Sequence, residues 1–311
     1  MKAITYRSYG GPEVLEYGDV ADPKVGPDSV LVKVRAAAVN PVDWKAREGR
    51  LDSAFDAVFP VVPGWDVSGV VTQPGASVTE FAVGDEVVGY VREDMLSRGT
   101  FAEYVAAPVR TLARKPRNIG FEEAAGLPLT GLTAYQALTR ALRVQEGEVV
   151  LVHAAAGGVG SAAVQIARHF GARVIGTASA GNHDYLRELG AEPVDYREDL
   201  AEGVRQLASG GVDAILDTVG GDTLRRSEHL LAPDGRLVSV ADHEVVSLGG
   251  RYLFVRPDAE DLRRLSELVE HEELRVHVAE TFPLPEAAEA HRRSQEGHTR
   301  GKIVVTVDWG D

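Results

Sequence analysis

The chain has 311 residues, enough for two domains that each bury a core of their own. Hydrophobic residues make up 44% of it and charged residues 26%, which excludes a disordered chain and is typical of a globular protein. The formal net charge of −14 argues against a nucleic-acid partner and against binding to anionic membranes, because both need a basic surface.

Targeting and metal-binding signals are missing from the sequence. The first residues, "MKAITYRSYGG", lack the apolar run of a signal peptide, and no later run approaches the length of a membrane span. We therefore expect a cytoplasmic protein with no membrane partner. The chain has no cysteine, which excludes thiolate nucleophiles and cysteine-liganded zinc. Its 9 histidines show no ligand spacing such as H-x-x-x-H, so we expect no metal site.

Short β-branched runs dominate the chain up to about residue 115. The runs are "KAITYRS", "SVLVKVRAAAV", "VSGVVTQ", "DEVVGYV" and "FAEYVAAP", and turn signals such as "VGPD" and "PGAS" separate them. This part of the chain has no amphipathic helix apart from a possible turn at Val42–Gly49. The pattern predicts a compact antiparallel barrel or sandwich.

From about residue 120 the pattern changes to an alternation of strands and helices. We expect strands at 149–154, 173–178, 193–195, 212–217, 236–241 and 252–256, and helices at 159–170, 183–189, 199–208 and 222–231. Such alternation with short connections indicates βαβ units, and therefore a parallel sheet covered on both faces. After two further helical segments comes a last strand, "GKIVVTVDW", which we expect to return to the N-terminal domain.

A glycine cluster follows the first of the predicted parallel strands. Gly157, Gly158 and Gly160 open a helix directly after that strand, as a dinucleotide-binding turn requires. In such a turn one glycine allows the sharp bend, another allows the helix to pack closely, and helix N–H groups face the phosphates. Ala155 stands where the motif usually has its first glycine. The alternative is a tight strand-to-helix turn that binds nothing.

The end of the second parallel strand bears on the choice of nucleotide. NAD sites place an acid about 20 residues after the glycines, where it binds the ribose hydroxyls. Here the strand ends in "TASAGNH", and no acid follows before Asp184. Thr177, Ser179 and Asn182 are small polar residues suited to binding a 2′-phosphate. The sequence therefore favours NADPH as the cofactor.

Ordered blocks along nearly the whole chain resemble one protein family. They are "MKAITYRSYGGPEVLE", "AAAVNPVDWKAREG", "PVVPGWDVSGVV", "GTFAEYVAAP", "AAGLPLTGLTAYQAL", "VLVHAAAGGVGSAAVQIA", "LDTVGG" and "GHTRGKIVV". With these blocks the chain resembles the zinc-independent medium-chain dehydrogenases/reductases, and within them the quinone oxidoreductase (zeta-crystallin-like) branch.

The resemblance implies an α/β fold class with two domains. One is a discontinuous GroES-like β-barrel domain, and the other is a Rossmann domain with a doubly wound parallel sheet. We expect the catalytic GroES-like domain at 1–121, the NADP(H)-binding Rossmann domain at 122–256, and a return to the catalytic domain at 257–311. The family's active site lies in the cleft between the two domains, so we expect it there in this chain.

The residues that hold zinc in the zinc-dependent relatives are absent. Asn40 stands in the segment where those relatives have a catalytic Cys, and Gly64-Trp65-Asp66 replaces their Gly-His-Glu. Without a Lewis acid, a simple carbonyl is hard to polarise. The better-matched reaction is hydride transfer to a quinone or to an α,β-unsaturated carbonyl. Alternatives are an enoyl thioester reductase of polyketide or fatty-acid type, and a non-catalytic NADPH-binding protein.

Several site residues follow from the family's motifs. Asn40 would point toward the nicotinamide, unless it only caps the turn before Pro41, and Thr130 would approach the nicotinamide ribose or phosphates, unless it only starts a helix. The expected cofactor-binding residues are Ala156, Gly157, Gly158 and Val159 of the turn, Thr177, Ser179, Asn182 and Tyr196 near the adenosine phosphate, and Val240, Ala241, Phe254 and Val255 at the last strand ends. For Tyr196 and the four residues at the last strand ends, the alternative is that they only pack in the fold. Relatives often carry a Lys where this chain has Gly181, which weakens the expected preference for NADPH. Asp43, Trp44 and Asp66 are candidates for acids or gates near the cleft, but we interpret them as structural.

The segment Gly249–Pro257 is expected to form the edge strand of the parallel sheet. An apolar edge strand invites pairing with a second chain. As in relatives, we expect this strand to meet its two-fold mate in a homodimer. The alternative is a monomer in which the following helix, 258–271, covers the strand.

Overall fold

The structure, a computed structural model, describes residues 1–310. Among these residues no helix is long and apolar enough to cross a membrane. The packing divides the chain into two units, one made of residues 1–129, 256–271 and 276–310, and the other of residues 130–255 and 272–275. The domain boundaries expected from the sequence, after residues 121 and 256, remain predictions.

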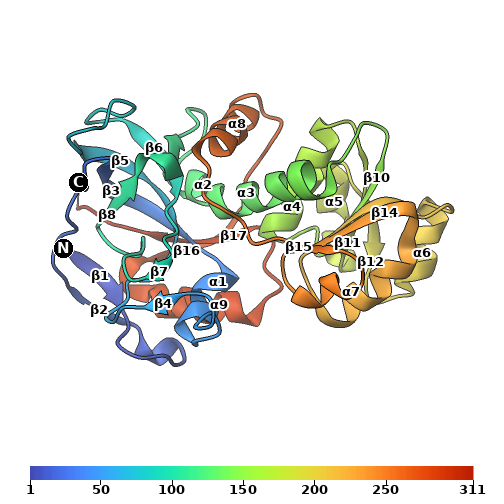
Figure 1. Cartoon of the computed structure of the whole chain (residues 1–311), viewed down its shortest axis with the longest axis horizontal. Helices are drawn as coiled ribbons and strands as arrows, with labels where there is room; N and C mark the ends of the chain where they lie inside the picture. The colour runs from blue at the N-terminus through green and yellow to red at the C-terminus, as the bar shows by residue number, and fades with distance from the viewer. Residues whose placement is uncertain (311) are drawn as a thin grey trace. The chain divides into compact units, whose positions relative to one another are not determined.

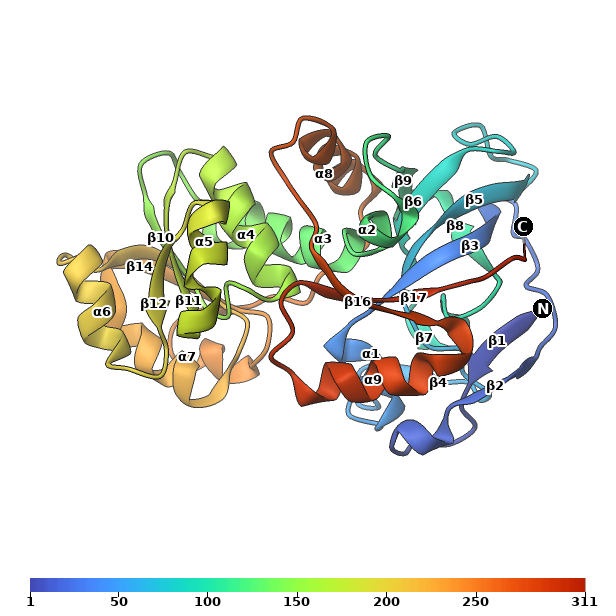
Figure 2. The ribbon, with the colours of Figure 1, turned by 180° about the vertical axis from the view of Figure 1, so that it is seen from behind.

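The first unit is built mainly of strands. They are β1 (Lys2–Thr5), β2 (Glu16–Asp19), β3 (Ser29–Val39), β4 (Asp56–Ala57), β5 (Asp66–Pro74), β6 (Glu86–Tyr90), β7 (Met95–Leu96), β8 (Tyr104–Pro108), β9 (Leu112–Arg114), β16 (Val278–Pro283) and β17 (Lys302–Thr306). Its helices are α1 (Pro41–Arg47), α2 (Phe121–Ala125), α8 (Ala259–Glu270) and α9 (Ala287–Glu296). Figure 1 labels these elements except β9, which is labelled in Figure 2. The turn predicted at Val42–Gly49 is α1.

One sheet of seven strands organises this unit. Its strands follow the order β16-β17-β3-β5-β6-β9, and β8 also pairs with β3. β17 lies antiparallel to β3, with Val304 opposite Ala38. The last strand therefore returns to the N-terminal sheet, as predicted. The strands of this sheet that precede residue 115 pair antiparallel, as predicted, whereas β16 and β17 near the end of the chain are parallel to each other.

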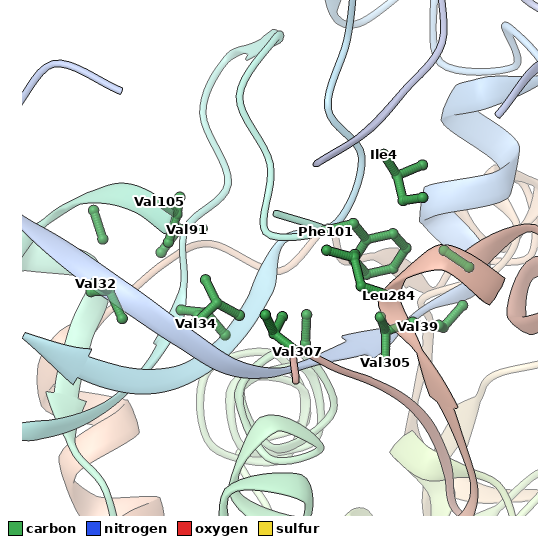
Figure 3. Close-up of a cluster of buried hydrophobic side chains, with 14 of the residues drawn as sticks. Ile4, Val32, Val34, Val39, Val91, Phe101, Val105, Leu284, Val305 and Val307 are labelled. Carbon is green, nitrogen blue, oxygen red and sulfur yellow. The ribbon is translucent and has the colours of Figure 1, made fainter. Parts of the chain in front are cut away.

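The core of this unit follows from the alternation along β3. Val30, Val32 and Val34 are completely buried, while the residues between them are only half-buried. Alternation with a period of two places these valines on one face of the sheet. Figure 3 shows Val34 in the same cluster as Phe101 and as Val305 from β17. Residues from both ends of the chain thus share one core.

The second unit is a parallel sheet with helices. Its strands are β10 (Val149–Val152), β11 (Arg173–Ala178), β12 (Glu192–Asp195), β13 (Val212–Asp217), β14 (Leu231–Ser239) and β15 (Arg251–Tyr252), and its helices are α4 (Gly158–His169), α5 (His183–Leu189), α6 (Leu200–Leu207) and α7 (Gly221–Ser227). The helix α3 (Pro128–Gln136) begins in the first unit and continues in the second. Figure 2 shows α4 and α5 side by side, next to β10 and β11.

The strand order is β12-β11-β10-β13-β14-β15, and every neighbouring pair is parallel. Numbered from β10, this is the order 3-2-1-4-5-6 of the doubly wound dinucleotide-binding fold. Ligands bind such sheets beyond the carboxyl ends of the strands, where the order reverses, here between β10 and β13. The predicted α/β fold class is confirmed.

Three predicted elements differ clearly from the structure. The helix expected at 222–231 ends at Ser227, and β14 begins at Leu231, five residues before the predicted start at 236. The strand expected at 252–256 is only Arg251–Tyr252, although it does lie at the edge of the sheet. Beyond it, the amide of Leu253 still bonds Ser239 O at 3.0 Å. Because β14 ends at Ser239, β15 has no strand beside it with which to pair after that point.

Candidate functional site

The glycine turn connects β10 to α4 in the second unit. Ala154 has a left-handed backbone (φ 47°), which sends the chain sharply out of the strand. A Cβ on Gly160 would lie 2.3 Å from the carbonyl oxygen of Ala154, so only glycine fits there. The predicted turn residues Ala156, Gly157, Gly158 and Val159 lie together at the start of α4.

The start of α4 suits a negatively charged group. Gly157 occupies the N-cap position, no side chain caps the helix, and its first turn holds no acidic residue. Uncapped N–H groups at a helix start, together with the helix dipole, attract phosphate. The turn therefore has the features that a dinucleotide pyrophosphate requires.

Thr177 at the end of β11 holds the glycine turn in place. Its side chain is buried, with 2% of the residue exposed. Thr177 Oγ1 accepts a hydrogen bond from Ala154 N at 3.1 Å, and Thr177 O accepts one from Ala155 N at 2.9 Å. The hydroxyl that we expected to bind a phosphate is thus engaged inside the protein. Its role as a direct ligand stays a prediction.

The loop after β11 contains the other residues expected near the adenosine phosphate. Asn182 Nδ2 donates to Ser179 Oγ at 3.3 Å, so the two polar side chains are adjacent. A Cβ on Gly181 would meet nothing within 4 Å, which leaves room for a longer side chain. Tyr196, just after β12, is exposed.

The sequence reasoning missed Asp195 and Arg197 beside this loop. Asp195 Oδ2 accepts a hydrogen bond from Ala180 N at 3.0 Å, and the amide of Arg197, with a further bond from Ala180, lowers the pKa of Asp195. An ionised carboxylate therefore lies on the loop, although none follows β11 directly in sequence. The guanidinium of Arg197 lies 5.6 Å from the centre of the Tyr196 ring. The sequence Asp195-Tyr196-Arg197 could have indicated this pair of charges, because both charged residues flank the predicted Tyr196.

The remaining predicted residues of the second unit lie just beyond its last strands and, for Thr130, near the start of α3. Val240 N bonds to Asp217 O at 3.0 Å, which fixes Val240 just beyond β14. Phe254 is 41% exposed, whereas Val255 is buried. Thr130 is buried near the start of α3. The cofactor contacts expected for these residues, and the cleft between the domains, remain predictions.

Asn40 belongs to a buried polar cluster in the first unit. Its side chain is almost fully buried, and Nδ2 donates to Asp66 Oδ2 at 2.9 Å. Its Oδ1 accepts a hydrogen bond from Lys302 Nζ, which also donates to Val39 O at 3.0 Å. Asn40 thus bridges the ammonium of Lys302 and the carboxylate of Asp66. We name Asn40, Asp43, Asp66 and Lys302 the buried polar cluster.

Backbone groups satisfy the two carboxyl groups of this cluster. Asp66 Oδ1 accepts from the amide of Leu129 at 2.9 Å, and Asp43 Oδ2 accepts from the amide of Asn40 at 2.7 Å. The second contact caps the start of α1, as suits an acid in the first helical turn. Capping of the turn before Pro41 was the alternative role expected for Asn40. In the structure, the Asp43 carboxyl contributes to this capping by accepting the hydrogen bond of the Asn40 amide. The interpretation of Asp43 and Asp66 as structural remains a prediction.

Burial shifts the pKa values of all three charged members of the cluster. Loss of water raises the pKa of Asp43 to about 8, against the lowering effect of the Asn40 amide. It raises the pKa of Asp66 to about 6, because Lys302 and two hydrogen bonds offset part of the burial. Burial also lowers the pKa of Lys302. At neutral pH the raised pKa keeps Asp43 protonated, and Asn40 links the side chains of Lys302 and Asp66.

Lys302 is the member that sequence reasoning missed. It lies 262 residues from Asn40, so no local pattern connects the two. The block "GHTRGKIVV" marked its strand but not its side chain. Asn40 and Asp66 stand in the segments where zinc-dependent relatives have their zinc-binding residues. In this chain the Asn40 amide donates a hydrogen bond to the Asp66 carboxylate. Among residues 1–310, no three His, Asp or Glu side chains come together as metal ligands.

The protonated Asp43 makes stability depend on pH. Between its ordinary pKa of 3.8 and about 8, the folded protein holds a proton that the unfolded chain has released. Stability from this group is therefore present in acid and is lost as pH rises toward 8. Asp43→Asn keeps an acceptor for the Asn40 amide and removes the titration. We expect the free energy of unfolding of this variant, relative to that of the wild type, to increase by about 1 kcal/mol for each pH unit from pH 5 to 8, as measured by urea denaturation.

The exposed carboxyl of Asp28 provides the control, because Asp28→Asn removes an acid without burial. We expect no such pH trend for that variant. A difference between Asp43→Asn and the wild type that stays constant from pH 5 to 8 would contradict the assignment of the proton to Asp43.

Comparisons with known proteins agree with this geometry. Residues 26–117 match the alcohol dehydrogenase GroES-like domain, and residues 189–305 match a family described as zinc-binding dehydrogenase. The chain is 36% identical to the chloroplastic NADPH-dependent alkenal/one oxidoreductase of Arabidopsis thaliana over 98% of this chain and 79% of that one.

Two solved structures resemble the chain over nearly its whole length. The quinone oxidoreductase of Coxiella burnetii has a TM-score of 0.89 and 37% identity, and covers 99% of each chain. The CurK enoyl reductase has a TM-score of 0.86 and 28% identity over 99% of both chains. The chain is therefore an oxidoreductase with a nicotinamide-binding fold, and it belongs to the zinc-independent quinone oxidoreductase branch of the medium-chain dehydrogenases/reductases.

Proposed function

We propose that this protein binds NADPH at the glycine turn and transfers its hydride, without zinc, to a quinone or an α,β-unsaturated carbonyl. The observation that carries the proposal is the contact between Gly160 and Ala154 O, which brings an uncapped helix start against the end of β10. This geometry fits a pyrophosphate. When bound, the reduced nicotinamide supplies the hydride.

The chemistry of the buried polar cluster supports the choice of electrophile. Asn40 and Asp66 are bonded to each other, and the Asn40 amide is bonded to Lys302, so these side chains present no free ligand set to a metal ion. A substrate must then carry its own activation, and conjugation with a carbonyl provides it. The chain contributes binding, orientation and exclusion of water rather than a nucleophile.

A panel of electrophiles tests the proposed reaction. We expect NADPH oxidation with 1,4-benzoquinone or with a 2-enone, and far slower oxidation with the corresponding saturated ketone, because an unconjugated carbonyl is harder to reduce without a Lewis acid. Turnover is followed by the loss of NADPH absorbance. Equal rates with the saturated ketone, or none with any conjugated substrate, would refute the proposal.

An enoyl thioester in the same panel tests the second candidate. The likeness to the CurK enoyl reductase is the observation that favours it. A kcat/KM for the thioester well above that for the enone would assign the protein to that class. NADPH binding without turnover of any of the three would identify a non-catalytic binding protein.

The loop after β11 supports NADPH over NADH, with a small margin. Ser179 and Asn182 offer polar groups, and Arg197 adds a cation to the same region. The carboxylate of Asp195, which bonds the amide of Ala180, opposes a 2′-phosphate. Gly181 provides no charge at all. We therefore propose that both nucleotides bind and that NADPH binds more tightly.

Gly181→Lys should widen this margin, because a lysine fits there and an ammonium can bond the 2′-phosphate. We expect binding of NADPH to strengthen by about 1 kcal/mol and binding of NADH to stay unchanged, as measured by fluorescence titration. Gly210→Lys adds the same charge at another open glycine and serves as the control. Tighter binding of NADH than of NADPH by the unmodified protein would disprove the preference.

We further propose that the protein is a homodimer that pairs through β15. This strand forms one edge of the parallel sheet, and Phe254, just beyond it, is 41% exposed. An isologous pairing of two such edges would cover both and extend the sheet. The helix expected to cover the strand in a monomer, α8, packs against β9 of the first unit.

Phe254→Asp tests the proposed contact by placing a charge on the exposed apolar side chain. We expect light scattering to give a two-chain mass for the wild type and a one-chain mass for this variant at micromolar concentration. The same charge at exposed Val83, in Val83→Asp, should leave the dimer intact. A one-chain mass for the wild type would exclude the dimer.

A further inference from the structure

A completely buried histidine stands behind the glycine turn. His153 follows β10 directly, and its ring lies between side chains from two other elements. His153 Nδ1 is 3.2 Å from Thr177 Oγ1 of β11, and His153 Nε2 is 2.7 Å from Ser227 Oγ of α7. Its backbone oxygen accepts from Thr218 Oγ1 at 2.9 Å. All these residues belong to the second unit.

The partners fix the direction of every hydrogen bond. Ser227 Oγ lies 2.6 Å from the carbonyl oxygen of Thr223, which can only accept, so the serine proton points there. Ser227 Oγ must then accept from His153, which places the ring proton on Nε2. In a neutral ring Nδ1 is left as an acceptor, and Thr177 donates to it. Thr177 Oγ1 accepts in turn from the amide of Ala154.

The ring is neutral in the folded protein. Burial lowers the pKa of His153 to about 4, and the nearby carboxylate of Asp217 offsets only part of this effect. That carboxylate is itself bonded to Ser239 Oγ at 2.6 Å and to the amide of Gly220 at 3.0 Å. It therefore does not need the imidazole as a partner. The chain of bonds from Ala154 through Thr177 and His153 to Ser227 runs in one direction without a break.

This chain of bonds starts at Ala154, the residue that opens the glycine turn. Its left-handed backbone places its carbonyl oxygen where only glycine at position 160 can approach. That conformation is unfavourable for a residue with a Cβ and persists only when the surroundings fix it. The bond from Ala154 N to Thr177 Oγ1 is such a constraint. The orientation of Thr177, which His153 sets, therefore controls the shape of the turn.

We propose that His153, as the neutral Nε2–H tautomer, is a positioning residue for the nicotinamide cofactor: through Thr177 it holds the glycine turn in its binding conformation. The proposal rests on the proposed function, because it assumes that a dinucleotide binds at this turn. It assigns Thr177 an indirect role in place of the direct phosphate contact expected from the sequence.

Three substitutions test the proposal through cofactor affinity. Thr177→Val keeps the shape of the side chain and leaves Ala154 N without its acceptor, so the free turn relaxes and must be reordered on binding. We expect its Kd for NADPH to rise about tenfold, as loss of a buried hydrogen bond implies. His153→Phe should have the same effect. Thr177→Ser keeps the hydroxyl and should bind NADPH as the wild type does.

Thr139→Val provides the matched control. It makes the same change in the second unit at a hydroxyl that bonds only the local backbone, Tyr135 O. A purely structural role of Thr177 would lower the melting temperature and leave Kd unchanged. We expect instead that Kd and the KM for NADPH rise in Thr177→Val, while the KM for the electrophile does not. An unchanged Kd in Thr177→Val and His153→Phe would overturn the proposal.

The tautomer gives a readout that needs no variant. His291 is also completely buried, so the rings in the nitrogen spectrum of histidine-labelled wild-type protein are assigned through their backbone resonances. We expect the ring of His153 to have a protonated Nε2 and a bare Nδ1 at neutral pH. A proton on Nδ1 would overturn the proposal, even if the variants fail to fold. Failure of the wild type to bind NADPH or NADH would instead overturn the proposed function, so the two failures are distinguishable.

Discussion

The approach of α4 to the carbonyl of Ala154 is the constraint on which the second unit depends. A Cβ on Gly160 would lie 2.3 Å from that oxygen, so any side chain there would push the helix away from β10. The helix would then lose its place at the reversal of strand order, where the parallel sheet opens toward a ligand. The bonds of Thr177 to Ala154 and Ala155 serve the same end from the neighbouring strand. Helix, turn and β11 thus form one rigid element.

The two units differ in which groups contact their buried titratable side chains. In the second unit the buried imidazole is neutral, and the buried carboxylate of Asp217 is bonded to backbone amides and a serine. In the first unit a lysine and an aspartate are buried together, with Asn40 between them. Removing one charge of such a pair would leave the other without compensation. Asn40 is therefore held in place by its neighbours.

The sequence predicted those parts of the fold that local patterns determine. The parallel sheet was predictable because each strand and helix carries its own apolar period and the glycine turn lies between two of them. The length of β15 was not predictable, because it depends on where β14 ends. Lys302 was missed for a related reason, since its contact with Asn40 exists only after β17 has paired with β3. Hydrogen-bond partners distant in sequence leave no local signal.

The same limit applies to Thr177, which the sequence predicts to bind a phosphate. From its sequence position, a threonine at the end of the second parallel strand looks available to a nucleotide. In the fold, its Oγ1 lies 3.2 Å from His153 Nδ1 and accepts a hydrogen bond from Ala154 N, two contacts that no local pattern predicts. Nucleotide choice then depends on the loop beyond it, where Asp195 and Arg197 bring opposite charges to the same place. A carboxylate favours ribose hydroxyls and a guanidinium favours phosphate, so the charges at this loop do not favour one nucleotide alone.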